Sequence, residues 1–361
     1  MCMMDNNRSS CHISHDLDMY MFPIIYITVI VISIPTNCIS LYISYQQIKK
    51  KNELGVYLFN LSLSDLLYTT TLPFWVDFSL NHNHWRFADW ACKLSAFFMH
   101  TNLYSSAGFL TCISIDRYLA VVFPLKFYQL RTRTTAVLVS LLVWTLQGAS
   151  NVVILLKRET FIVISHKAGN NSNEVNDTVC YDNFPMEEWK SYFSIVNVCS
   201  GHFLPLIIMV FCYLKIYAAV KTNQATDEGD KIKIKQLLFA IVVSFVISFT
   251  PYHIVLLIRS LKEPNNCTFA NKMFYPYKIT LALSSVNCMA DPFLYCFVSE
   301  AGRADLRTLL NCFTNKFESS SKNGSVTKNE YMMGTISRNN VQENECPSPI
   351  NKPEIDMKPA H

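Results

Sequence analysis

Seven long apolar stretches constrain the fold of this chain more than any other feature of its sequence. They cover residues 22–46, 54–80, 90–123, 135–156, 191–219, 233–260 and 274–298. A helix that spans a bilayer needs about 20 predominantly apolar residues, and each stretch is long enough to provide them. Only 16% of the residues are charged, which is below the roughly 25% of a typical soluble domain. The sequence therefore predicts an all-α membrane protein, built as a seven-transmembrane helix bundle.

Basic residues gather on alternate loops between these stretches. Lys49, Lys50 and Lys51 follow the first stretch, and Arg131 and Arg133 lie between the third and the fourth. Because cytoplasmic loops carry an excess of Lys and Arg, we expect the N-terminus outside the cell and the carboxyl-terminal tail inside. The chain is thus predicted to be a multi-pass protein of the plasma membrane.

Acceptor sequences for N-linked glycans agree with this orientation. The Asn-x-Ser/Thr pattern marks surface loops of proteins that pass through the secretory route. Four such sites fall on the predicted outer side, at Asn7, Asn170, Asn176 and Asn266.

Composition divides the chain into four regions. Residues 1–21 are a polar extracellular N-terminus, and residues 22–298 hold the seven-helix bundle. Residues 299–317 are predicted to form a short amphipathic eighth helix on the membrane surface. Residues 318–361 are rich in Ser, Asn, Lys and Glu. Such a segment cannot bury enough apolar surface to fold, so a disordered cytoplasmic tail is expected.

Short motifs stand at set places along the seven stretches. The third stretch ends in Asp116-Arg117-Tyr118, and the seventh contains Asp291-Pro292-Phe293-Leu294-Tyr295. The others are Asn37, Leu63-Ser64-Asp65, Trp144, Pro205, Tyr213 and Phe249-Thr250-Pro251. Taken together and in this order, over residues 20–313, they resemble the rhodopsin-like class of G-protein-coupled receptors.

That resemblance implies a heterotrimeric G protein as the partner. Asp116 and Arg117 are expected to pair at the cytoplasmic end of the third helix, and on activation Arg117 is released to meet the G protein. The other residues that the resemblance assigns to activation and coupling are Tyr118, Tyr213, Pro292 and Tyr295. Arrestin and receptor kinases are the expected partners of the tail.

Four cysteines resemble the disulfide pattern of the same class. Cys92 begins the third stretch and Cys180 lies in the second outer loop, so they match the usual disulfide of the family, which an oxidising exterior permits. Cys11 and Cys267 would then tie the N-terminus to the third outer loop. Two free thiols are the alternative for this second pair.

Asp65 and Asp291 are the only acids expected near the middle of the membrane, where charge is costly and usually functional. The resemblance implies that they lie close together, with Asn102 and Ser106 nearby. Such a site resembles the sodium site of the class, so a structural sodium ion at Asp65, Ser106 and Asp291 is the one cofactor expected. The alternative is that the Asp-Pro-x-x-Tyr motif belongs to a whole branch of these receptors and says nothing of the ligand.

A closer resemblance is to the proton-sensing receptors of this class. The segments typical of that group are residues 52–58, 72–75, 115–122, 251–253 and 290–292. This resemblance implies activation by extracellular acid and coupling to the stimulatory G protein, which raises cyclic AMP. Two departures stand out, because Gln147 replaces a glutamate and Lys278 replaces a histidine that some members carry.

Histidine changes its charge at the pH values that such a receptor would sense. The candidate sensors are four outer histidines, one histidine of the sixth stretch and the two mid-membrane acids: His12, His15, His82, His84, His253, Asp65 and Asp291. Moving a population from 1:99 to 99:1 takes about 5.5 kcal/mol. One pKa unit of difference between two states supplies only about 1.4 kcal/mol. Several groups must therefore act together.

Other functions remain open on the sequence alone. A receptor for a lysolipid or glycosphingolipid such as psychosine would use Lys278, Arg259 and Lys93 for the head group. A transporter or channel is more remote, since the chain has no internal repeat. The sequence contains neither His-Glu-x-x-His nor Gly-x-Ser-x-Gly, so no enzyme is predicted. Its net charge of +4 is too small to indicate a nucleic-acid partner.

Overall fold

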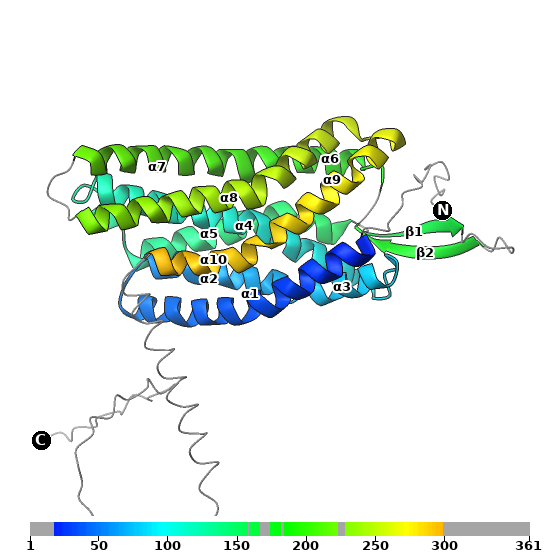
Figure 1. Cartoon of the computed structure of the whole chain (residues 1–361), viewed down its shortest axis with the longest axis horizontal. Coiled ribbons are helices and arrows are strands. Elements are labelled where there is room, and N and C mark those ends of the chain that lie inside the picture. The colour runs from blue at the N-terminus through cyan, green and yellow to red at the C-terminus, as the bar shows by residue number, and fades with distance from the viewer. Residues whose placement is uncertain (1–17, 158, 167–173, 182–183, 223–227, 299–361) are drawn as a thin grey trace, which may run out of the picture. The chain divides into compact units, whose positions relative to one another are not determined.

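The computed structural model describes residues 18–157, 159–166, 174–181, 184–222 and 228–298. Within these ranges, seven helical segments lie side by side as a bundle (Figure 1), which confirms the predicted fold class. In chain order they are α1 (Asp18–Lys49), α2 (Leu54–Thr69) continued by α3 (Leu72–Leu80), α4 (Asp89–Val122), α5 (Arg133–Leu156), α6 (Glu188–Val198) continued through the π-helical turn η2 (Cys199–Phe203) into α7 (Leu204–Thr222), α8 (Glu228–Lys262), and α9 (Cys267–Ser285) continued by α10 (Asn287–Val298). A single 3-10 turn, η1 (Tyr128–Leu130), separates α4 from α5. The predicted eighth helix and tail lie outside the described residues.

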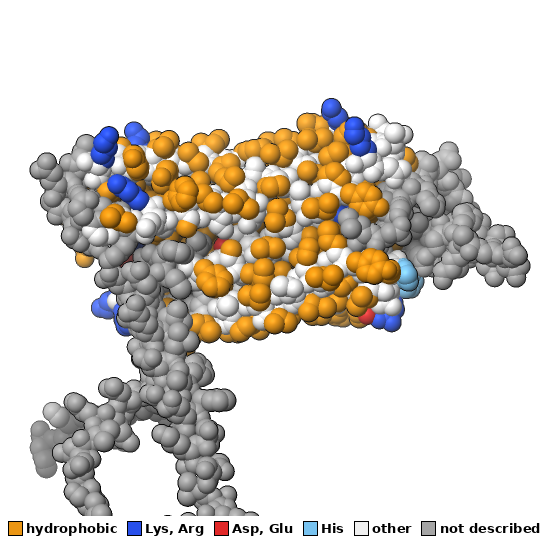
Figure 2. All heavy atoms as spheres, viewed as in Figure 1, with side chains coloured by type: hydrophobic (Ala, Val, Ile, Leu, Met, Phe, Trp, Pro, Cys, Tyr) orange, Lys and Arg blue, Asp and Glu red, His pale blue; other side chains and the backbone are white. Residues whose placement is uncertain are grey.

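Large apolar side chains cover the side of the bundle. Figure 2 shows them over its length, with Lys and Arg side chains near its two ends. Ile24 of α1 is 67% exposed and Ile207 of α7 is 65% exposed. Soluble proteins rarely expose so wide an apolar surface. By length and composition alone, α1, α5, the α6–α7 segment and α8 could each cross a membrane.

The other three spans do not meet the same criteria of length and composition. One of them carries buried polar residues, and the other two are interrupted helices. In α4, Asn102, Ser105 and Ser106 are buried in the bundle, which is where polar groups of membrane helices usually lie. The span of α2 and α3 and that of α9 and α10 are each interrupted by a short break. These breaks shorten each apolar run without ending the span.

Pro292 leaves one backbone carbonyl of α10 without its usual donor. Proline has no N–H, so the carbonyl four residues earlier loses its helical hydrogen bond. That residue is Cys288, and α1 supplies the missing donors. The side-chain nitrogen of Asn37 lies 2.8 Å from the Cys288 oxygen, and the hydroxyl of Ser33 lies 3.1 Å from it. A neighbouring helix therefore supplies the hydrogen bonds that α10 lacks because of Pro292.

A β-hairpin that the sequence did not predict follows α5. Strand β1 (Thr160–His166) pairs with strand β2 (Glu174–Cys180) in an antiparallel register that sets Thr160 opposite Cys180. The hairpin extends from the end of the bundle where α1 begins and α3 ends (Figure 1). We call this the outer end, and the end that carries Asp116 and Arg117 the inner end.

Disulfide bonds cross-link segments at the outer end of the bundle. Cys180 of β2 forms a disulfide with Cys92 of α4, as predicted, with their Cα atoms 5.7 Å apart. Cys267 at the start of α9 is also disulfide-bonded. Its predicted partner, Cys11, lies outside the described residues. Asn266, an expected glycan acceptor, is exposed just before α9, whereas the side chains of the other three acceptors lie outside the described part.

Candidate functional site

The predicted activation residues gather at the inner end. Nε of Arg117 donates to Oδ2 of Asp116 at 3.0 Å, so the expected pair is present. Tyr118 and Tyr213 each pack against a small apolar cluster of α7 and α8. Pro292 is buried. The side chain of Tyr295 lies outside the described residues.

Two further charged residues join this pair, and sequence reasoning did not give either a role. Arg131, in the loop before α5, contacts Oδ1 of Asp116 at 3.2 Å through Nε. Its Nη2 lies 2.6 Å from Oε1 of Glu53, which stands just before α2. The sequence carried only a weak sign of this role. Arg131 contributed to the positive charge of the inner loops, and Glu53 lay within a segment typical of the proton-sensing group.

Each of the two mid-membrane acids accepts a hydrogen bond from a buried asparagine. The Asn102 side-chain nitrogen donates to Oδ1 of Asp65 at 2.9 Å, and that of Asn287 donates to Oδ2 of Asp291 at 2.6 Å. Oδ2 of Asp65 and Oδ1 of Asp291 have no hydrogen-bond partner among the described residues. Together with the buried hydroxyl of Ser106, they offer oxygen donors of the kind that a small hard cation takes.

The candidate histidines fall in three different environments. His84 is half-buried after α3, where its Nδ1 accepts a hydrogen bond from the backbone N–H of Thr178 in β2, at 3.3 Å. His82 is exposed and has a φ of 55°, a left-handed conformation that is uncommon for residues other than glycine. His12 and His15 lie outside the described residues.

His253 is buried in the bundle, where the sequence gave no sign of its main neighbour. Its Nδ1 faces the Phe249 carbonyl oxygen at 2.8 Å and must donate to it. Its ring is stacked on that of His202 in η2, with centroids 4.2 Å apart. Nε2 of His253 and both ring nitrogens of His202 lack hydrogen-bond partners among the described residues.

Buried ion pairs lie at the outer end, and they were not predicted. The ammonium of Lys190 in α6 lies 2.6 Å from Oε2 of Glu159, which precedes β1. Glu159 is fully buried. Burial raises the pKa of its carboxyl group above the ordinary value of 4.5, and the neighbouring Lys190 ammonium offsets only part of this effect. This carboxyl group is therefore protonated more readily than one in water.

The bases proposed for a lipid head group are also paired. Lys278 lies 3.5 Å from Asp18, Arg259 donates to Glu263 at 2.7 Å, and Lys93 lies 2.8 Å from Asp89. An anionic ligand would have to compete with these carboxylates.

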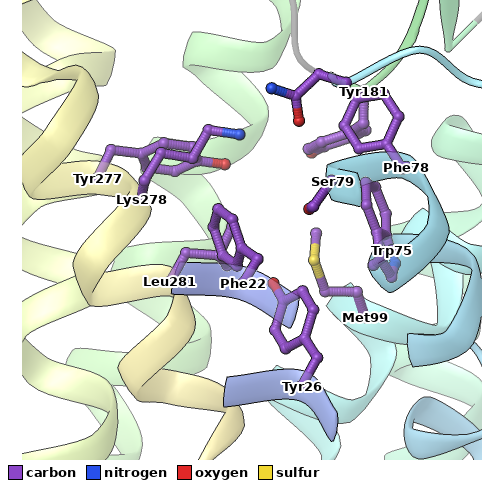
Figure 3. Close-up of a pocket in the computed structure, with 11 residues that line it drawn as sticks. Phe22, Tyr26, Trp75, Phe78, Ser79, Met99, Tyr181, Tyr277, Lys278 and Leu281 are labelled. Carbon is purple, nitrogen blue, oxygen red and sulfur yellow. The ribbon is translucent and has the colours of Figure 1, made fainter. Parts of the chain in front are cut away.

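A pocket opens between α1, α3, α4 and α9 (Figure 3). Phe22 and Tyr26 of α1 face Trp75 of α3 across it, and Lys278 projects in from α9. The indole nitrogen of Trp75 and the amide nitrogen of Asn83, which also line the pocket, have no hydrogen-bond partner among the described residues. The pocket therefore combines aromatic walls with hydrogen-bond donors.

Comparison with known proteins identifies the family. A family model described as the 7 transmembrane receptor (rhodopsin family) matches residues 36–295. The chain belongs to this family of receptors. It is therefore a multi-pass membrane receptor with a G protein as partner, and not an enzyme.

Similarity to individual receptors indicates where this chain lies within the family. G-protein coupled receptor 65 of Homo sapiens is 46% identical over 321 residues, which cover 88% of this chain and 94% of that protein. G-protein coupled receptor 68 of Mus musculus is 40% identical over 84% of this chain and 80% of its own length. Lysophosphatidic acid receptor 6 of Mus musculus is 34% identical over 82% and 86%. These relatives agree with the predicted resemblance to the proton-sensing group.

Proposed function

We propose that this receptor is activated by extracellular acid and couples through Arg117 to the stimulatory G protein, raising cyclic AMP. The outer end, which carries the disulfide, would face the oxidising exterior. The hydrogen bond from Thr178 to Nδ1 of His84 carries the proposal. A protonated imidazole has two donors and no acceptor. Acid would therefore break this tie between the end of α3 and strand β2.

The buried pair of Glu159 and Lys190 supports the same proposal. Protonation of Glu159 would leave the Lys190 ammonium buried without its carboxylate, which is costly. A rearrangement that exposes Lys190 would relieve that cost. Acid activates only if the sensing groups bind protons more tightly in the active state than in the inactive one. Several groups at the outer end could together supply this difference in proton affinity. One group is not enough, because a pKa difference of one unit supplies about 1.4 kcal/mol and a full shift of the population takes about 5.5 kcal/mol.

Asp65 and Asp291 are proposed to hold a sodium ion with Ser106. Their unpartnered carboxylate oxygens support this assignment. A bound cation would favour the charged form of both acids, so protonation and sodium binding would oppose each other. The proposal also includes arrestin and receptor kinases as partners of the tail.

A receptor for a lysolipid or a glycosphingolipid such as psychosine is the second candidate. It is favoured by the pocket in Figure 3, where Lys278 and the unpartnered donors of Trp75 and Asn83 adjoin aromatic side chains. The similarity to a receptor named for lysophosphatidic acid points the same way. A pH titration without added lipid separates the two candidates.

The test is cyclic AMP in cells expressing this chain, as external pH falls from about 8 to about 6, the range in which histidine titrates. Acid should raise cyclic AMP in the native chain and not in Arg117→Ala. His84→Asn keeps a neutral acceptor and should shift the response to lower pH. His84→Phe removes the acceptor and should raise signalling at pH 8.

His82→Asn is the matched control, because His82 is exposed, and its response should follow that of the native chain. A flat response in a well-expressed native chain would refute coupling to cyclic AMP. Equal shifts for His82→Asn and His84→Asn would remove the role given to the Thr178 contact.

A further inference from the structure

Four charged side chains form a closed network at the inner end. Asp116 receives Arg117 on one carboxylate oxygen and Arg131 on the other, at 3.0 Å and 3.2 Å. Glu53 receives Arg131 at 2.6 Å and lies 4.0 Å from Arg117. Each guanidinium is thus shared by the same two carboxylates.

The network joins three parts of the chain and is only partly open to solvent. Glu53 stands at the start of α2, Asp116 and Arg117 at the end of α4, and Arg131 just after η1. Asp116 is 6% exposed, and the side chains of Glu53, Arg131 and Arg117 are 16%, 19% and 20% exposed. Such ion pairs are worth more than exposed pairs, because solvent screens them less. Removal of one member therefore changes how strongly the others are held.

We propose that Arg131 competes with Arg117 for Asp116 and Glu53, and so sets how readily Arg117 leaves the network. This inference rests on the proposed role of Arg117 in coupling. When Arg117 leaves, Arg131 remains on Asp116 and Glu53, so neither carboxylate is left without a counter-ion. Leaving a poorly solvated carboxylate without its counter-ion would otherwise be unfavourable. Arg131 is thus a positioning residue that acts through the charge on Asp116.

The number of charges left in the network predicts whether each substitution holds Arg117 more tightly or more loosely. Arg131→Gln leaves two carboxylates for the single guanidinium of Arg117, so Arg117 is held more tightly. Glu53→Gln leaves two guanidiniums for the single carboxylate of Asp116, so Arg117 is held more loosely. The double variant restores one carboxylate and one guanidinium. A merely structural role would instead make both single variants change signalling in the same direction.

The experiment measures receptor-stimulated nucleotide exchange on purified G proteins of each class, with the full-length receptor in lipid nanodiscs. At pH 8, Glu53→Gln should raise basal exchange and Arg131→Gln should lower it, each by about fivefold or more, the low end for coupled sites. The double variant and Arg131→Lys, which keeps the charge, should lie near the native chain. Arg133→Gln is the matched control, because Arg133 is exposed and makes no ion pair among the described residues.

The same variants are titrated with acid, where Arg131→Gln should need a lower pH for half-maximal exchange than the native chain. Single variants that change exchange in the same direction, or an Arg131→Gln variant that matches Arg133→Gln, would overturn the inference. If the native chain ignores acid, the proton proposal fails, while the opposite basal effects of the two single variants still decide the role of Arg131.

Discussion

Lys190→Met removes the ammonium that pairs with the buried Glu159, while it keeps a side chain of similar length. Breaking a buried ion pair by removing one partner typically costs about 3–5 kcal/mol, because the other charge stays buried without compensation. Here the remaining group is an acid that can escape this cost by taking up a proton. The destabilisation should therefore depend on pH.

The destabilisation by Lys190→Met cannot exceed the free energy of protonating Glu159, because a protonated carboxyl group carries no uncompensated charge. The ordinary pKa of glutamate sets this upper limit. Protonating a group with an unfolded pKa of 4.5 costs about 1.36 kcal/mol for each pH unit above that value. The ceiling is thus about 4.8 kcal/mol at pH 8 and about 1.4 kcal/mol at pH 5.5. Because burial raises the pKa of Glu159 in the folded chain, its contribution favours folding below 4.5 and is lost as pH rises through the folded value. Because the Lys190 ammonium lowers the pKa of Glu159, Lys190→Met should extend this loss to higher pH.

The assay is thermal unfolding of the purified receptor in nanodiscs at both pH values. Relative to the native chain, Lys190→Met should lower Tm clearly more at pH 8 than at pH 5.5. Lys93→Met is the matched control, because the pair of Lys93 and Asp89 is partly exposed and should be worth under about 1 kcal/mol at either pH. An equal fall in Tm at both pH values would refute the reasoning, because it would mean that Glu159 is not left as an uncompensated buried charge.

Two further outcomes follow from packing and covalent structure. A Cβ at Gly201 would lie 2.5 Å from a ring carbon of Tyr104, so Gly201→Ala should cost about 1–3 kcal/mol in thermal unfolding. Gly148→Ala, where a Cβ meets nothing within 4 Å, should instead stabilise α5 by about 0.5–1 kcal/mol. Cys92→Ala opens a disulfide between residues separated by 88 positions, worth at most about 4–5 kcal/mol in chain entropy. It should reduce surface expression and Tm, whereas Cys199→Ala, at an exposed free cysteine, should leave both unchanged.

The number and order of the helices could be predicted because the apolar length of a span is a local property of the sequence. Breaks within the spans could not. Nothing in the composition of residues 199–203 signals a π-helical turn, and the hairpin of β1 and β2 is short and polar in part. These features depend on what packs against the segment.

The candidate site was predictable where a motif placed residues next to each other, as for Asp116 and Arg117. It was not predictable where partners come from distant segments. Arg131 meets Glu53 across 78 positions, and the backbone of Thr178 meets His84 across 94. A charged loop residue carries no local sign of the partner that the fold will bring to it. His84 was named from its residue type and its place, whereas its partner is a backbone group that no side-chain pattern can reveal.

The contact between α1 and the Cys288 carbonyl of α10 bears on how the seventh span can move. Among the described residues, Asn37 and Ser33 reach the Cys288 carbonyl from another helix and donate hydrogen bonds to it. A rotation of α10 about Pro292 would leave that oxygen without a hydrogen bond unless α1 moves with it or water replaces the lost donors. The contact thus couples the two helices, and α1 becomes a partner in any motion of α10.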